Sequence, residues 1–179
     1  MIQNDIALLE LGEPLENNAF IRPIALSSKD PKPGTICRVS GWGLTKEGET
    51  VLIAHPYLKE IEVSILPSKE CFLFFSWMSF DNSKICGFSE KGCPNLGDSG
   101  GPLICKDHLS GVISFGRMHH CLGAANCFTS THYHHNWIQY IISQSEYKRR
   151  NGDYLTFKFI DIFKYFNFFV KSLKKFFIF

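Results

Sequence analysis

Short apolar runs, broken by glycine and proline, recur along the first 150 residues, and this pattern restricts the fold more than any other feature. Ile61, Val63 and Ile65 alternate with polar residues, as in a strand with one buried face. Several such strands separated by turn residues predict an all-β domain. The other strands are predicted at residues 36–43, 103–105 and 111–115.

Two helices are predicted beside the strands. Residues 67–70 can start a short helix, with Ser68 as its N-cap. Asn136 is expected to cap a second helix, because apolar residues follow it at helical spacing and would bury one face. These residues are Trp137, Ile138, Ile141 and Ile142.

Composition and charge exclude several classes of protein. With 45% hydrophobic residues the chain is too apolar to be wholly disordered. A net charge of only +2 argues against binding nucleic acid through bulk charge. No apolar stretch approaches the roughly 18–20 residues that a membrane span requires. We therefore expect neither a nucleic-acid partner nor a membrane-spanning segment.

The chain changes character close to residue 149, which predicts a boundary between residues 1–148 and a tail at 149–179. Nine of the 17 phenylalanines fall in residues 151–179, together with five lysines and two aspartates. Three interpretations stay open: translated non-coding sequence, an extra helix docked on the domain, or a basic amphipathic helix on a membrane surface. The first is preferred, and no membrane contact by the tail is expected.

Seven cysteines are scattered singly, without the paired Cys-x-x-Cys motifs of a zinc ribbon. Wide spacing is typical of disulfide partners, which implies an oxidising compartment, and the odd number leaves at least one thiol unpaired. The N-terminus, however, has neither the basic nor the apolar region of a signal peptide. This conflict indicates that the chain is incomplete.

Residues 97–102, with the sequence GDSGGP, carry the strongest chemical signal. Asp, Ser, Gly and Pro are also the ordinary residues of a surface turn. A serine between glycines, however, can be held exposed while nearby backbone N–H groups point at a developing oxyanion. Such a serine is a poor nucleophile until a base activates it.

At this point the chain resembles the trypsin/chymotrypsin-like serine proteases. The GDSGGP segment matches the nucleophile motif of that family, and NDIALL at residues 4–9 matches the motif around its catalytic aspartate. SGWG at residues 40–43 and the Trp137 helix match further signatures in the family order. The resemblance implies a double β-barrel fold, represented here by the end of the first barrel, the complete second barrel and the C-terminal helix.

The resemblance also implies a role for each site residue. Ser99 would be the nucleophile, Asp5 would orient a histidine, and the N–H groups of Gly97 and Ser99 would form the oxyanion hole. Asp98 would pair with a newly freed N-terminal amine in the activated enzyme. The substrate-binding strand would be Ser114, Phe115 and Gly116, with phenylalanine where the family usually has tryptophan, and Cys93 would lie at the primary pocket.

Three disulfides follow from the same resemblance. Cys37 corresponds to the partner of Cys105, and Cys71 to the partner of Cys86. Cys93 and Cys121 resemble the pair that braces the specificity pocket. Cys93 lies six residues before Ser99, farther than the family spacing. Cys127 has no partner in this scheme and is interpreted as a small buried apolar residue.

The catalytic histidine of the family lies before its aspartate, in the context Ala-Ala-His-Cys. None of the seven histidines here precedes Asp5 or matches that base, and the Ile-Val-Gly-Gly start of the activated family is also missing. We therefore expect that the chain belongs by family to the serine endopeptidases. We also expect that the 179 residues alone are inactive. The alternative is a non-catalytic homologue that acts as a binding or regulatory module.

Specificity, partners and compartment complete the expectations. Counting back from Ser99 places Cys93 at the base of the primary pocket, and aligning the cysteine places Lys91 or Gly92 there. Without an acidic residue, a preference for apolar or small side chains, or a pocket that does not work, is expected. Protein or peptide substrates, protein inhibitors and secretion are expected from the family. No cofactor or metal is expected, because the cluster of His132, His134 and His135 has no second ligand group nearby.

Overall fold

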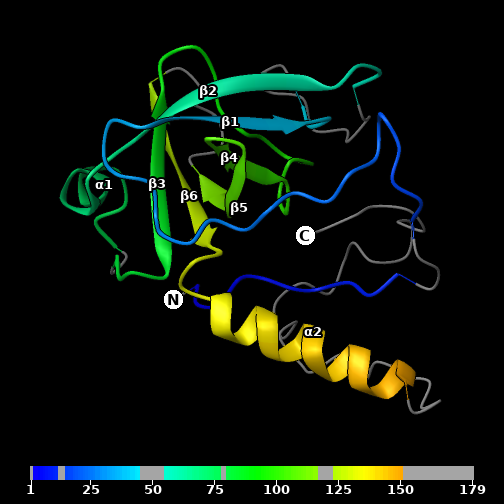
Figure 1. The fold of residues 1–179 in the computed structure, drawn as a ribbon. Coiled ribbons are helices and arrows are strands. Elements are labelled where there is room, and N and C mark those ends of the chain that lie inside the picture. Colours follow the sequence, from blue (N-terminus) through cyan, green and yellow to red (C-terminus); the bar gives the residue numbers. More distant parts are fainter. Residues whose placement is uncertain (1, 12–14, 45–54, 78–79, 117–122, 151–179) are drawn as a thin grey trace.

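Six strands close into a barrel in the computed structural model, which describes residues 2–11, 15–44, 55–77, 80–116 and 123–150 but not the side chains of 145–150 (Figure 1). Their order around the barrel is β1-β2-β3-β6-β5-β4, and every neighbouring pair is antiparallel. The all-β prediction is confirmed. The strands are β1 (Ile36–Gly41), β2 (Lys59–Ile65), β3 (Lys84–Ser89), β4 (Pro102–Cys105), β5 (His108–Gly116) and β6 (Ala124–Ser130).

The barrel interior holds the main hydrophobic core. Val63 and Ile65 of β2 are buried there, as the alternating pattern predicts. Phe128 of β6 is fully buried against them, and Gly87 on the neighbouring strand leaves room for its ring. The strands therefore close because each contributes one apolar face to a shared interior.

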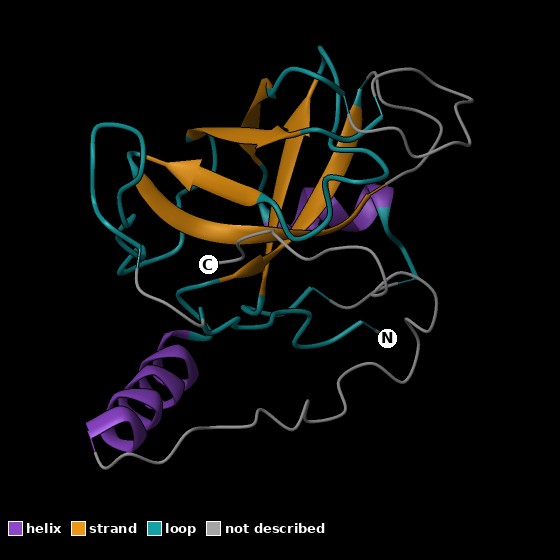
Figure 2. Cartoon of the chain, turned by 90° about the vertical axis from the view of Figure 1, so that its right-hand side faces the viewer, coloured by secondary structure: helices purple, strands orange, loops and turns teal. Residues whose placement is uncertain are grey.

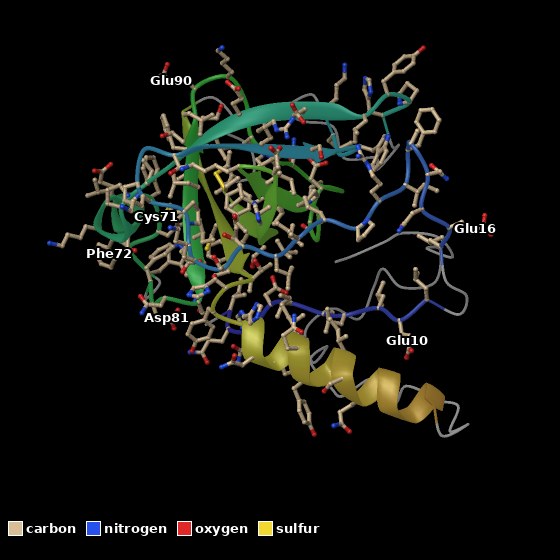
Figure 3. All side chains as sticks on the ribbon, in the orientation of Figure 1. Glu10, Glu16, Cys71, Phe72, Asp81 and Glu90 are labelled. Atoms are coloured by element: carbon tan, nitrogen blue, oxygen red, sulfur yellow. A yellow bond between two sulfur atoms is a disulfide. The ribbon has the colours of Figure 1, made fainter. Side chains whose placement is uncertain are left out.

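Helix α1 (Ser68–Phe74) lies outside the barrel beside β3 (Figures 1 and 3). Its N-cap is Pro67, and no side chain caps it, so the prediction of Ser68 as N-cap is wrong. The ring of Pro67 supplies an extended entry into the helix, and Ser68 is already its first residue. Cys71 is fully buried, whereas its neighbour Phe72 is half exposed.

Helix α2 (His135–Arg150) follows β6, and it includes Asn136, so Asn136 is not its cap. The backbone turn before it, in which His135 N donates to His132 O, starts the helix one residue earlier. Ile138 is buried, but Trp137 and Ile142 stay exposed because the helix points away from the barrel (Figure 1). Among the described residues no helix is long and apolar enough to cross a membrane.

The N-terminal segment, described at residues 2–11 and 15–35, runs as irregular chain past α2 and the barrel (Figure 1), among the loops that Figure 2 colours teal. Ile6 is buried between Val112 of β5 and Ile138 of α2, which fixes one end of the segment. Further along, the segment exposes several large apolar side chains. These are Ile2, Leu9, Leu15, Phe20, Ile21 and Ile24, of which Phe20 is 97% exposed.

Candidate active site

Ser99 lies on an exposed, tightly folded turn between the loop at residues 91–98 and β4. Gly97 and Gly100, which flank Asp98 and Ser99, have φ angles of 97° and 83°. Residues other than glycine rarely adopt such positive φ angles. Asp98 N donates to Asn95 O at 3.0 Å, and Gly101 N donates to Asp98 O at 2.9 Å. Within the described part of the chain, the N–H groups of Gly97 and Ser99 donate to no protein acceptor. Both are therefore free to bind an anionic oxygen.

Two hydrogen bonds dock this turn onto β5. Gly100 N donates to Ile113 O, and Ile113 N donates to Gly101 O, both at 2.9 Å. Ser99 is thereby held next to the strand end that carries Ser114. The predicted nucleophile and the predicted substrate strand thus belong to one rigid unit.

Asp5 reaches the same strand end from the N-terminal segment. Ser114 Oγ donates a hydrogen bond to Asp5 Oδ2 at 2.6 Å, across 109 positions of sequence. The burial of Ile6 fixes the chain directly after Asp5. Among the described residues, no hydrogen bond joins Asp5 to Ser99.

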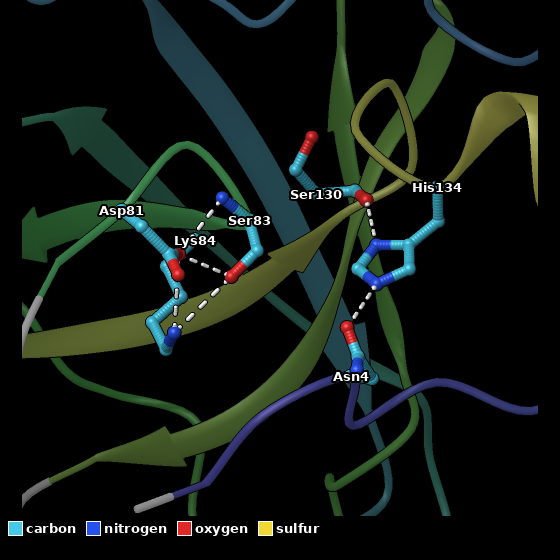
Figure 4. Close-up of polar contacts among 6 residues, drawn as sticks. All are labelled: Asn4, Asp81, Ser83, Lys84, Ser130 and His134. Atoms are coloured by element: carbon cyan, nitrogen blue, oxygen red, sulfur yellow. Dashed lines mark hydrogen bonds and ion pairs between the residues drawn. The ribbon is translucent and has the colours of Figure 1, made fainter.

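The residue before Asp5 is fixed by the start of α2 (Figure 4). His134 Nδ1 donates to the carbonyl oxygen of Ser130 at 2.8 Å, and its Nε2 lies 3.1 Å from Asn4 Oδ1. Asn4 also has a φ of 50°, so the backbone turns sharply at this position. The buried imidazole of His134 therefore has a structural role in presenting Asp5.

Asp98 lies beneath the turn, where its carboxylate accepts two backbone hydrogen bonds. Gly43 N donates to Oδ1 at 2.8 Å, and Asn95 N donates to Oδ2 at 2.9 Å. Asp98 also lines a cavity of about 310 Å³ between the end of β1, the start of β2 and the loop at residues 91–95. Lys59 and Lys91 line the same cavity.

Replacing Gly43 with alanine is expected to destabilise the fold by about 1–3 kcal/mol. A Cβ at this position would come within 2.6 Å of both carboxylate oxygens of Asp98, so the carboxylate would have to move. Urea unfolding monitored by tryptophan fluorescence measures the change.

Gly92→Ala is the matched control for that substitution. It lines the same cavity, but a Cβ there would come no closer than 3.7 Å to its nearest neighbour, Ile61. Equal stability of the two variants would show that the carboxylate of Asp98 does not pack against Gly43.

The cysteines divide into bonded and free groups. Disulfides join Cys37 to Cys105 and Cys71 to Cys86. Cys93 is also disulfide-bonded, and Cys121, its expected partner, lies outside the described residues. Cys127 has no disulfide partner in the described part, and burial raises the pKa of its thiol to about 12. The thiol is therefore protonated at neutral pH and is no nucleophile.

Phe115 packs into a partly exposed aromatic cluster on the outside of the barrel. Its ring lies edge-on to Phe75, with centroids 5.3 Å apart, and 6.0 Å from the ring of Trp77. Trp77 is 68% exposed. The cluster gives the strand end at residues 114–116 an apolar flank that an extended peptide could contact.

Asn126 is a buried polar residue that the sequence-based prediction did not single out. It stands on β6 directly opposite Gly116, and its side chain is buried. The signal in the sequence was a single amide inside the otherwise apolar run of residues 124–128. No group of three or more His, Cys, Asp or Glu that could hold a metal occurs in the described residues, so His132, His134 and His135 form no such group.

Comparison with known proteins decides the family. The family model for trypsin matches residues 1–138. The chain belongs to the trypsin family. This confirms the resemblance that the motifs around Asp5 and Ser99 indicate.

Relatives of this trypsin-family chain include alpha-fibrinogenase albofibrase from Trimeresurus albolabris, 34% identical over 80% of this chain and 56% of the relative. Venom plasminogen activator Haly-PA from Gloydius brevicauda is 32% identical over 78% of this chain and 54% of the relative. The structure of neuropsin, a serine protease of mouse brain, matches with a TM-score of 0.64 at 25% identity, over 73% of this chain and 58% of neuropsin. The chain thus spans about half the length of the curated relatives it matches.

Proposed function

We propose that this trypsin-family chain carries the nucleophile-bearing half of a serine endopeptidase. The hydrogen bond between Ser114 and Asp5 carries the proposal, because it joins the predicted catalytic acid to the predicted substrate strand. The turn at residues 97–101, docked on the same strand, supports Ser99 as the nucleophile.

The proposed reaction is acyl transfer from a peptide to Ser99. A histidine oriented by Asp5 takes the proton of Ser99 Oγ while the oxygen attacks the scissile carbonyl carbon. The free N–H groups of Gly97 and Ser99 bind the negative oxygen of the tetrahedral intermediate. The histidine then returns the proton to the leaving amine, and water hydrolyses the acyl-enzyme by the same route.

Asp98 and the strand end at residues 114–116 have supporting roles in this proposal. The cavity beside Asp98 gives a newly freed chain terminus room to pair with its carboxylate, which would set the conformation of the oxyanion-binding turn. An extended substrate would add to the edge at Gly116 as a further strand. Secretion, protein substrates and protein inhibitors belong to the same proposal, and the disulfides favour an oxidising compartment.

A complete triad requires a histidine that these 179 residues do not supply, since none precedes Asp5. The 179-residue chain alone is therefore expected to be inactive. A non-catalytic binding module is the second candidate function, and the displaced position of Cys93, six residues before Ser99, favours it.

A fluorophosphonate that labels activated serines distinguishes the two functions. Joined to a histidine-bearing first barrel, the chain is expected to be labelled at Ser99, whereas the 179 residues alone are not, because an unactivated serine reacts slowly. Intact-mass and peptide mass spectrometry locate the label.

Ser99→Ala in the joined protein is the control and should abolish the label. Absence of labelling in a correctly folded joined protein would reject the endopeptidase and favour the binding module. Labelling of the isolated chain would contradict its predicted inactivity.

A further inference from the structure

Three cysteines come together beneath α1, on the outer face of the barrel. Cys71 of α1 (Figure 3) is disulfide-bonded to Cys86 of β3. Cys127 of β6 stands directly opposite Cys86 in the antiparallel pair of β3 and β6. Residues paired in this way point to the same face of a sheet. Cys127 therefore lies on the face that carries the disulfide, although it has no disulfide partner of its own in the described part of the chain.

Aromatic contacts show that α1 covers this face. Phe88, two positions after Cys86 on β3, has its ring 5.9 Å from an aromatic ring of α1. Phe115 stands opposite Cys127 on β5, and its ring lies 5.3 Å from that of Phe75 at the end of α1. Cys127 is fully buried. Its thiol is thus enclosed under the helix that the neighbouring disulfide tethers.

The spacing across the two strands is close to that of a disulfide. Opposite residues on antiparallel strands have Cβ atoms about 4.5–5.5 Å apart, and a disulfide requires about 3.5–4.5 Å. A movement of about 1 Å is therefore enough to bring the sulfur of Cys127 to that of Cys86. Cys37 and Cys105 offer no such approach, because both belong to the core inside the barrel, on the other face of the sheet.

We propose that Cys127 is an exchange partner for this disulfide, which makes the attachment of α1 to the barrel a thiol–disulfide switch. The sulfur of Cys127 loses its proton and attacks Sγ of Cys86. The bond between Cys86 and Cys71 breaks, and Cys71 leaves as a thiolate that takes up a proton. One disulfide and one thiol are present before and after the step, so no oxidant or reductant is consumed.

Exchange releases α1 from β3. The helix has seven residues, too few to be stable without tertiary contacts. Phe75 N donates a hydrogen bond to Cys71 O at 3.1 Å, so the freed helix also loosens the contact between the rings of Phe75 and Phe115. Phe115 lies on the predicted substrate strand. An effect on substrate binding rests on the proposed endopeptidase function, whereas the exchange itself does not.

Burial keeps the exchange slow at neutral pH. It raises the pKa of the Cys127 thiol to about 12, and the charged groups around the thiol change that pKa less. Lys84 of β3 lowers it, while Asp5 of the N-terminal segment and Asp81 before β3 raise it. Only the thiolate attacks, so the exchange rate is expected to be about 100-fold higher at pH 9 than at pH 7.

Cys71→Ala tests the geometry. It leaves Cys86 and Cys127 as thiols, and oxidised glutathione is expected to join them in the folded protein. Peptide mass spectrometry locates the new bond. Cys105→Ala is the matched control, because it frees Cys37 inside the barrel, where the sheet separates it from Cys127. Two alkylatable thiols should remain in this control, and two remaining in Cys71→Ala would overturn the proposal.

Wild-type protein held at pH 9 with excess iodoacetamide tests the exchange itself and needs no variant to fold. The expected product is alkylated at Cys71 and carries a bond between Cys86 and Cys127. Cys127→Ser should give no such product. Alkylation of Cys127 with the original disulfide intact, or no alkylation at either cysteine, would overturn the switch.

Neither measurement uses catalysis, which separates this inference from the endopeptidase. Failure of Ser99 to react with fluorophosphonate would reject the endopeptidase and leave the exchange standing. A disulfide that does not exchange would reject the switch and leave the endopeptidase standing.

Discussion

Asp5→Asn is expected to lower kcat about 10⁴-fold in a protein that joins this chain to a histidine-bearing first barrel. Asparagine can present an N–H group where the carboxylate presents an acceptor, so the histidine would be held in the wrong tautomer. Ser114 Oγ, which donates to Asp5 Oδ2 at 2.6 Å, keeps an acceptor in the amide oxygen and need not move. Steady-state hydrolysis of a peptide amide measures the loss.

Ser114→Ala tests how much the position of the Asp5 carboxylate matters apart from its negative charge. It removes one hydrogen bond to the exposed carboxylate of Asp5 but leaves the negative charge in place. A decrease of about tenfold is expected, since an exposed hydrogen bond to a charged group contributes roughly 1.5 kcal/mol, the lower end of its usual range. An Asp5→Asn protein as active as Ser114→Ala would show that Asp5 is not the acid of the triad.

Removal of the disulfide between Cys37 and Cys105 is expected to cost about 4 kcal/mol of stability, which is a large share of the total for a small domain. This bond closes a loop with a sequence separation of 68 and links β1 to the end of β4. Breaking it gives the unfolded chain much more conformational freedom. Urea unfolding of the double alanine variant under oxidising conditions gives the difference in free energy.

The disulfide between Cys71 and Cys86 is the internal reference for that measurement. Its sequence separation is only 15, so the same chain-entropy argument gives about 3 kcal/mol. Both pairs are at least 95% buried, which makes the loss of packing in the two double alanine variants similar. A larger loss for the shorter loop would show that local packing, and not loop length, decides the effect.

The strands were predictable because their signal is local. Val63 and Ile65 alternate with polar residues, and this period of two is what a sheet with one buried face requires. The helix starts were not predictable from the same kind of signal. Ser68 and Asn136 are good capping residues, but Pro67 and the turn at residues 132–135 already fix the chain before either side chain is needed.

The sequence names candidate residues for the site, but it does not predict the contacts among them. The motifs identified Asp5, Ser99 and Ser114 separately, and the order of the motifs along the chain indicated the family. The hydrogen bond between Asp5 and Ser114 depends on the packing of Ile6 against β5 and α2, which no local pattern encodes. The position of Asn126 between glycines on both neighbouring strands was not predictable either, because those residues adjoin it only in the folded barrel.

Closure of the barrel limits the ways in which two copies of this chain can associate. Among the described residues all six strands have hydrogen-bonded neighbours on both sides, although the end of β5 at residues 114–116 extends beyond its pairing with β4. Several of the exposed large apolar side chains, among them Leu15 and Phe20, lie on the N-terminal segment outside the ring. Polar substitutions at Phe20 and Leu15 are therefore expected to reduce self-association of the isolated chain through this segment without disturbing the barrel, because neither residue lies in a strand.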